Sequence, residues 1–170
     1  MATVITPPAF EPVTVQEAKR WLRVDHSEDD ALIGSLIRAA REWVEHYTNT
    51  AFAQRTLEVT GYRMVYGAGP GIGPIEEVVS VTVGDTTLAP ADYYLSQTYP
   101  YDTVLLHARA TDVLTVRVKV GEATVADDVP DVVKVAMQLI ITENYEKRTD
   151  RIRKMPTAAE NLLNPVRRWV

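Results

Sequence analysis

Residues 27–48 read SEDDALIGSLIRAAREWVEHYT and contain the clearest periodic pattern in the chain. Apolar side chains recur there at intervals of three and four residues, which aligns them in one stripe along an α-helix. The stripe consists of Leu32, Ile33, Leu36, Ile37, Ala40, Trp43, Val44 and Tyr47. Ser27 is a suitable N-cap, so the acidic residues 28–30 are expected in the first turn, where the helix dipole favours negative charge. The charged residues of the helix lie mostly outside the stripe: Arg38, Arg41, Glu42 and Glu45.

A shorter helix is predicted immediately before this one. Thr14 and Glu17 have the spacing of a capping box, in which each side chain accepts a hydrogen bond from the other residue's backbone amide. The helix is expected to end at about Leu22 or Arg23, and its apolar face is formed by Val15, Ala18, Trp21 and Leu22. Residues 1–12 contain three prolines and no periodicity, so we interpret them as an extended arm.

Between residues 55 and 120 the apolar pattern changes to that of β-strands. Strands are expected at residues 57–60, 78–83, 93–95, 104–106 and 114–120. The last alternates cleanly, with Leu114, Val116, Val118 and Val120 on one face and Thr115, Arg117 and Lys119 on the other. Gly84 and Asp85 suit a tight hairpin turn, and residues 67–74 form a loop rich in Gly and Pro.

Helical signals return after Asp127 and Asp128, which precede Pro130 in the manner of a helix start. The apolar positions of this helix are Val132, Val133, Ala136, Leu139, Ile140 and Tyr145. Lys147 and Arg148 suit its C-terminal end, because cations there interact favourably with the helix dipole. A basic loop at 151–155, a short helix at 157–163 and a tail at 165–170 are expected to follow.

This order of elements predicts an α+β fold, in which a helical bundle carries an inserted small antiparallel β domain. We expect residues 1–54 to supply the arm and two helices, residues 55–124 the β insertion, and residues 125–170 the C-terminal helices and basic tail. The first and last of these segments are expected to pack together as one helical unit. A chain of 170 residues is long enough to bury a core of this kind.

Charge is distributed unevenly along the chain, whose net charge is −5. Residues 145–170 contain seven basic and three acidic residues, a net of +4, so the other 144 residues carry −9. An acidic body disfavours a protein that coats DNA, and a basic tail indicates a segment that reaches an acidic partner. The tail also has apolar residues at Leu162, Leu163, Val166, Trp169 and Val170, which predicts that it docks on the protein's own body or on a partner.

The sequence does not assemble a recognisable catalytic or metal site. Three histidines lie in different predicted elements, and the chain has no cysteine, which fits synthesis in a reducing cytoplasm. Helix capping accounts for the acids at 25–30, and prolines at both ends of residues 70–74 remove the amides that a phosphate loop needs. No nucleophile, base and orienting group can be named. We therefore expect no enzyme activity, no cofactor and no metal, and neither a signal peptide nor a membrane span.

Several segments together resemble the head–tail connector (adaptor) family of tailed bacteriophages and phage-like particles, in its long form with a β insertion. Residues 13–25 and 28–33 resemble the family's opening "eAK-hLRvd…eDdalI" pattern, and residues 74–83 resemble its "P-v-.-V-.-S-V" strand. Residues 129–136 resemble the "vP..ik.A" helix and residues 145–148 its "YE-R" end, and residues 162–168 resemble the "LL-P-R" ending. The motifs follow the family's order over nearly the whole chain.

The resemblance implies a structural role in the virion neck, in a protein made in the bacterial host cytoplasm. Members form rings, commonly twelve-fold, beneath the portal protein, extend the DNA channel and meet a tail-side protein such as a stopper or tail terminator. DNA is expected to pass through without sequence-specific binding. The resemblance implies portal contacts by Leu162, Leu163, Arg167, Arg168 and Trp169, with Arg151, Arg153 and Lys154 nearby.

Three other functions stay open at the level of sequence. One is another virion assembly role, such as a head-completion or tail-terminator protein. Another is a small DNA-binding regulator that uses the basic C-terminal tail, for which steep salt dependence is expected. The last is an enzyme with unrecognised residues, for which a concave site with perturbed titratable groups is expected.

Overall fold

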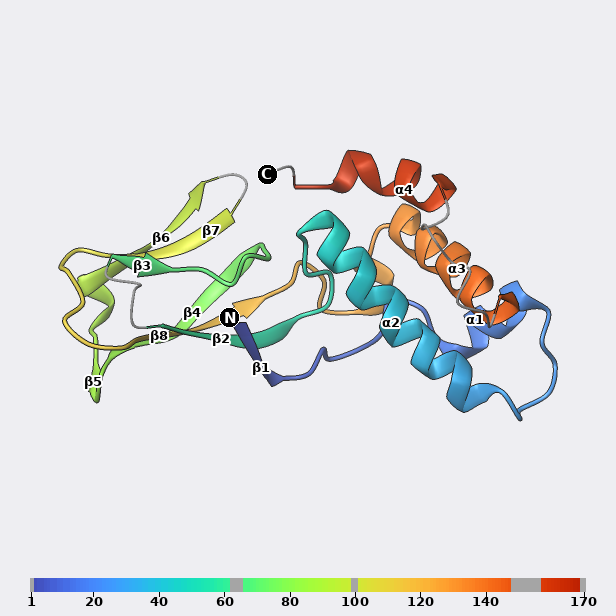
Figure 1. Cartoon of the computed structure of the whole chain (residues 1–170), viewed down its shortest axis with the longest axis horizontal. Helices are drawn as coiled ribbons and strands as arrows, with labels where there is room; N and C mark the ends of the chain where they lie inside the picture. The colour runs from blue at the N-terminus through green and yellow to red at the C-terminus, as the bar shows by residue number, and fades with distance from the viewer. Residues whose placement is uncertain (1, 62–65, 99–100, 148–156, 169–170) are drawn as a thin grey trace. The chain divides into compact units, whose positions relative to one another are not determined.

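The computed structural model describes residues 2–61, 66–98, 101–147 and 157–168. Within these ranges the chain forms four α-helices and eight strands in two antiparallel sheets, which confirms the predicted α+β class (Figure 1). The chain divides into two compact units. A helical unit comprises the described residues of Phe10–Thr48 and Val125–Arg167, and a β unit comprises those of Met1–Ala9, Asn49–Thr124 and Arg168–Val170.

The helical unit is built from α1 (Val15–Leu22), α2 (Asp30–Thr48), α3 (Asp131–Glu146) and α4 (Thr157–Leu163), with 3₁₀ turns η2 (Ala126–Asp128) and η3 (Asn164–Val166). Helix α3 packs against α1, α2 and α4. The core residues are Val13, Ala18, Ile33, Ile37, Ala40, Val44, Val129, Val133, Ala136, Met137, Ile140, Ile141, Ala159 and Leu163. Met137 and Ile141 were not among the predicted apolar positions of α3, and the predicted Val132 is 36% exposed.

The capping box at the start of α1 is present as predicted. The Thr14 hydroxyl oxygen accepts a hydrogen bond from the Glu17 amide at 3.2 Å, and Glu17 Oε2 accepts one from the Thr14 amide at 2.7 Å. The bonds from the Thr14 backbone and side chain stabilise the Glu17 carboxylate and lower its pKa. Helix α1 ends at Leu22 because Arg23 adopts a left-handed conformation with φ of 59°.

We expect Thr14→Ala to lower the free energy of unfolding by about 1 kcal/mol, because an N-cap bond is lost. The pKa of Glu17 is lower in the folded state than in the unfolded state. The ionised Glu17 carboxylate therefore stabilises the fold above the ordinary glutamate pKa, and this stabilisation is lost as pH falls through the lowered pKa. The difference in the free energy of unfolding between Thr14→Ala and the wild type should therefore become smaller at acidic pH. Urea unfolding at neutral and acidic pH measures both effects, with the exposed neighbour variant Gln16→Ala as the control. An unchanged deficit at low pH would contradict the role given to Glu17.

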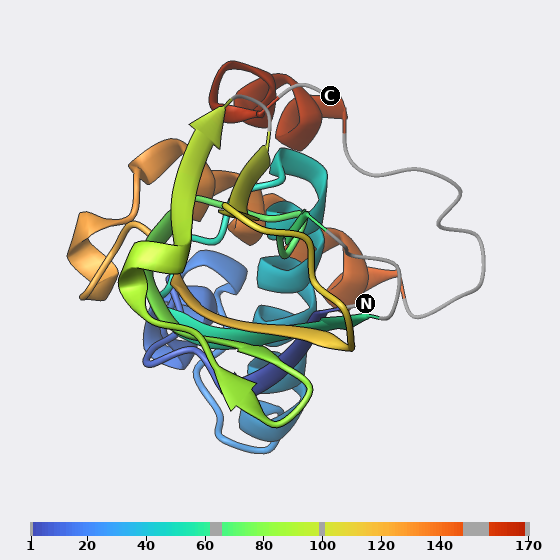
Figure 2. The ribbon, with the colours of Figure 1, turned by 90° about the vertical axis from the view of Figure 1, so that its left-hand side faces the viewer.

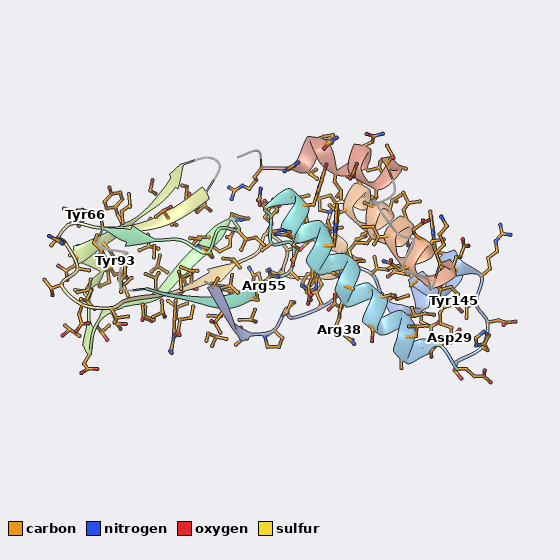
Figure 3. The ribbon with its side chains drawn as sticks, in the orientation of Figure 1. Asp29, Arg38, Arg55, Tyr66, Tyr93 and Tyr145 are labelled. Carbon is orange, nitrogen blue, oxygen red and sulfur yellow. The ribbon has the colours of Figure 1, made fainter. Side chains whose placement is uncertain are left out.

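Helix α2 begins at Asp30, so the prediction of an N-cap at Ser27 with three acids in the first turn is wrong. Two of these acids make tertiary contacts within the helical unit. Lys19 Nζ lies 2.6 Å from Asp30 Oδ1, and the Tyr145 hydroxyl donates to Asp29 Oδ2 at 2.5 Å. Asp29 and Tyr145 lie near each other in Figure 3. Contacts with α1 and α3, which the local sequence does not reveal, therefore engage two of the acids expected to cap α2.

Arg41 and Glu45 are buried in the helical unit although they lie outside the apolar stripe of α2. Arg41 Nη1 is 3.0 Å from Glu45 Oε2, and Arg41 Nε is 2.9 Å from Glu11 Oε2. Burial acts to lower the pKa of Arg41, but the carboxylates of Glu45 and Glu11 outweigh it, and the pKa is raised. The helical unit therefore encloses an ion-pair cluster of these three residues.

The β unit contains a five-stranded and a three-stranded sheet, both antiparallel (Figures 1 and 2). The larger sheet has the order β1 (Ala2–Thr6), β2 (Arg55–Gly61), β8 (Leu114–Val120), β4 (Ile75–Val83) and β5 (Thr86–Thr87). The smaller has the order β3 (Gly67–Ala68), β7 (Tyr101–Leu106) and β6 (Tyr93–Thr98), with the 3₁₀ turn η1 (Pro90–Asp92) leading into β6. Residues of both sheets contribute to one hydrophobic core.

Strand β8 lies at the centre of the larger sheet and shows the predicted alternation. Its four apolar residues are at most 1% exposed, and the opposite face includes Arg117, whose Nε lies 2.6 Å from Glu58 Oε2 on β2. The Gly84–Asp85 hairpin is also confirmed, because Val83 pairs with Thr86 and Gly84 has a φ of 56°. Strands β1, β3 and β5 were not predicted. Two of them are only two residues long, and β1 lies in the proline-containing arm.

Candidate functional site

The candidate site is the C-terminal segment, for which the sequence predicts docking. Of the eight residues expected to contact a portal, Leu162, Leu163, Arg167 and Arg168 are among the described residues. Arg151, Arg153, Lys154 and Trp169 lie outside them. Portal contact by any of the eight stays a prediction.

Leu163 is a core residue of the helical unit. Its exposed fraction is 0%, as is that of Ala159 one turn earlier, whereas Leu162 is half-buried. Helix α4 packs through this face on α3 and also contacts α2. From the sequence, deletion of residues 160–170 is expected to spare the fold. The structure contradicts that expectation, because the deletion removes Leu163 from the core.

Tyr47 at the end of α2 holds the segment that follows α4. Its hydroxyl donates a hydrogen bond to Asn164 Oδ1 at 2.8 Å, and its ring stacks on Trp43 with centroids 4.8 Å apart. The guanidinium carbon of Arg167 lies 4.6 Å from the centroid of the Tyr47 ring, which is cation–π geometry. Two residues assigned to the apolar stripe of α2 therefore form an aromatic platform for the C-terminal segment.

The chain passes into the β unit at Arg168, whose surroundings are polar and largely buried. Arg168 Nη2 lies 3.5 Å from Oδ1 of Asp102, a β7 residue whose side chain is 1% exposed. The Arg168 carbonyl oxygen accepts a hydrogen bond from Asn49 Nδ2 at 2.9 Å. Sequence reasoning missed Asp102 and Asn49, because neither belongs to a motif and each is far from Arg168 in the chain.

A metal-ligand cluster and a cavity with titratable side chains are features that a catalytic site would use. The described residues contain no group of three His, Asp or Glu side chains able to hold a metal ion. A cavity of about 390 Å³ in the β unit is lined in part by Leu88, Leu106, His107 and Arg109. Asp92 also lines it, but its carboxylate accepts a hydrogen bond from the Ala89 amide. No nucleophile paired with a base is found among these lining residues.

Among the described residues, no helix combines the length and apolar character needed to cross a membrane.

Comparison with known structures shows which proteins share this fold. The chain shares its fold with chains of three structures described as the neck of an empty GTA particle computed with C6 symmetry, the virion of a native gene transfer agent (GTA) particle, and the neck of a native GTA particle computed with C12 symmetry. The TM-scores are 0.80, 0.81 and 0.78, with 20% identity in each case. The alignments cover 100% of this chain and 96% of each of those chains.

A family model matches part of the sequence. Residues 12–79, which span α1, α2, β2, β3 and the first part of β4, match the family described as "Phage gp6-like head-tail connector protein". Over these residues, the match agrees with the family resemblance that the sequence motifs indicate. A search of curated protein sequences finds no significant match.

Proposed function

We propose that this protein is a structural head–tail connector of a phage or phage-like particle. The observation that carries the proposal is the agreement of two independent comparisons. The family model matches residues 12–79, and the fold of the whole chain is that of chains from structures of GTA necks and virions. The predictions of no enzyme activity and no cofactor accord with this role.

In this role the protein forms a ring beneath the portal and extends the DNA channel towards a tail-side protein. A ring joins two different patches of each subunit, because a self-complementary patch gives only a closed pair. The comparison with a neck computed with C12 symmetry supports twelve copies. A net charge of −9 on residues 1–144 favours a channel through which DNA slides without sequence-specific binding.

Cryo-electron microscopy of the neck of the particle that carries this protein tests the proposal directly. The expected result is a ring of this chain immediately under the portal, with its C-terminal segment against portal subunits. A ring between the neck and the tail tube would instead favour a tail-terminator role. Absence of the chain from the particle would overturn the connector role, and salt-dependent DNA binding would then test the regulator alternative.

Portal attachment is proposed to use the basic end of the chain. Arg167 and Arg168 are half-buried cations near the C-terminus, where a complementary acidic surface can accept them. We expect the double variant Arg167→Gln/Arg168→Gln to reduce co-purification with portal-bearing heads roughly tenfold or more, as is usual when charged contacts across an interface are lost. Lys147→Gln is the matched control, because Lys147 pairs with Glu143 on its own helix. Equal attachment of both variants would exclude the two arginines from the interface.

A further inference from the structure

Asp102 is a buried carboxylate that the proposed function does not use. It lies on β7, and its Oδ2 accepts a hydrogen bond from the Ile75 amide at 2.7 Å. Its Oδ1 has no hydrogen-bond partner among the described residues, and Arg168 is the cation within ion-pair distance in that part of the chain. Burying a carboxylate with its charge uncompensated is costly, so Asp102 requires a cation at this position.

The backbone around Asp102 is shaped to admit an arginine side chain. Gly73 lies beside it, and a Cβ atom at that position would lie 1.9 Å from Arg168 Nη1 and 3.1 Å from Asp102 Oδ2. Two backbone hydrogen bonds hold Gly73 in place. The Gly73 amide donates to the Asn49 carbonyl oxygen at 3.2 Å, and the Gly73 carbonyl oxygen accepts from the Ala51 amide at 2.7 Å. The absence of a side chain at Gly73 therefore provides the space that the guanidinium occupies.

Asn49 supplies a contact that recognises main chain. Its φ of 55° is in the left-handed region, at the residue directly after α2. The Asn49 side-chain amide donates to the carbonyl oxygen of Arg168, so the site engages both the side chain and the backbone of that residue. A salt bridge alone would accept any nearby cation, whereas the bond to the carbonyl oxygen requires a cationic residue within a peptide chain, and the space beside Gly73 accommodates the guanidinium of an arginine.

We propose that Asp102, Asn49 and Gly73 form a receptor for a peptide arginine, which Arg168 of the same chain fills before assembly. The proposal deepens the proposed function and rests on it, since Arg168 is one of the residues expected to meet the portal. While Asp102 holds its side chain and Asn49 its carbonyl oxygen, Arg168 is fixed on the β unit, and contact with a partner surface away from this site requires its release. Docking on the β unit therefore keeps Arg168 from contacting the portal until the portal displaces it from Asp102.

The observed ion pair is suited to such an exchange. The Nη2–Oδ1 separation of 3.5 Å is longer than that of a good charge-assisted hydrogen bond, and Arg168 Nη1 has no hydrogen-bond partner among the described residues. The Arg168 side chain is 24% exposed, so solvent and a competing carboxylate can reach it. The receptor thus holds Arg168 through contacts that a partner carboxylate with shorter hydrogen bonds can replace.

Hydrogen–deuterium exchange of the full-length free protein tests docking without any portal. We expect Asp102→Asn and Arg168→Gln each to accelerate amide exchange in residues 166–168 about fivefold or more, because release of the segment removes its local protection. Combining the two substitutions should add little, because both remove the same interaction. Asp85→Asn, at an exposed hairpin position, is the control and should leave the segment unchanged.

Two outcomes of that experiment would overturn the receptor. One is unchanged exchange in Arg168→Gln and in the double variant, which leaves no charge buried without its partner and so remains informative if a single variant folds poorly. The other is full additivity of the two substitutions, which would show that they act on separate contacts.

Attachment to portal-bearing heads then tests competition. Asp102→Asn should raise attachment severalfold, because it releases Arg168 without removing it, whereas Arg168→Gln should lower attachment. Unchanged attachment of Asp102→Asn, with exchange accelerated, would overturn the competition while leaving the receptor in place. Failure of the wild-type chain to attach to any portal would instead overturn the proposed function. The exchange result would still show whether Arg168 docks on Asp102 in the free protein.

Discussion

Replacement of Arg41 with glutamine is expected to lower the free energy of unfolding by about 3–5 kcal/mol, the usual result of removing one partner from a buried ion pair. The Arg41 side chain is 7% exposed and that of Glu45 is 2% exposed, so the glutamate would stay in the core without its cation. Glu11 would lose the same partner, but its side chain is 30% exposed and water can compensate it. Chemical denaturation followed by far-ultraviolet circular dichroism measures the loss.

A matched control separates burial from charge. Glu42 also lies near Arg41, with 3.6 Å between Oε1 and Nη2, but its side chain is 71% exposed. Glu42→Gln should therefore change the free energy of unfolding by less than about 1 kcal/mol, as for other exposed pairs. A loss of similar size in both variants would show that burial of the cluster does not set the cost.

The double variant Arg41→Met/Glu45→Leu tests whether the stability lost in Arg41→Gln comes from the lost ion pair or from the carboxylate that stays buried. Replacing both charges with apolar side chains of similar volume removes the buried carboxylate together with its cation, so we expect it to recover much of the stability that Arg41→Gln loses. A double variant as unstable as Arg41→Gln would indicate that the ion pair itself contributes strongly to folding.

Leu163→Ala is expected to cost about 2–5 kcal/mol, the range for truncating a fully buried leucine. Leu163 is 0% exposed at the end of α4, a helix of seven residues that is too short to be stable without packing. The loss should therefore also detach α4, which hydrogen exchange in residues 157–166 would report. Equilibrium denaturation measures the stability change.

Leu162→Ala is the control for this prediction, since it removes the same number of atoms at the neighbouring, half-buried position. Its effect should be clearly smaller. Equal losses would contradict the assignment of Leu163 as the core contact of α4. A deletion from residue 160 removes both leucines. Loss of portal attachment by such a deletion could therefore not be distinguished from loss of the fold, and point substitutions are the better test.

The local pattern of the sequence was sufficient for the elements and their class. Helices α1, α3 and α4 and strand β8 follow from capping signals and from periods of 3.6 and two residues, all of which operate between near neighbours in the chain. The motifs that resemble head–tail connectors are also local, which is why the amino-acid order alone is enough to recognise them. The two-residue strands β3 and β5 gave no such signal, because strands of that length have no period to detect.

The tertiary structure decided which polar residues act together. Glu11 meets Arg41 across 30 residues of sequence, and Arg168 reaches Asn49 across 119 and Asp102 on β7. The start of α2 was decided in the same way, since Asp29 and Asp30 engage Tyr145 and Lys19. Side-chain polarity and spacing report what a residue can bind, whereas the partner is chosen by burial and proximity that arise only when distant segments pack. The sequence by itself therefore determined the fold class and the resemblance to head–tail connectors, and only folding determined the buried Arg41 cluster and the site that holds Arg168.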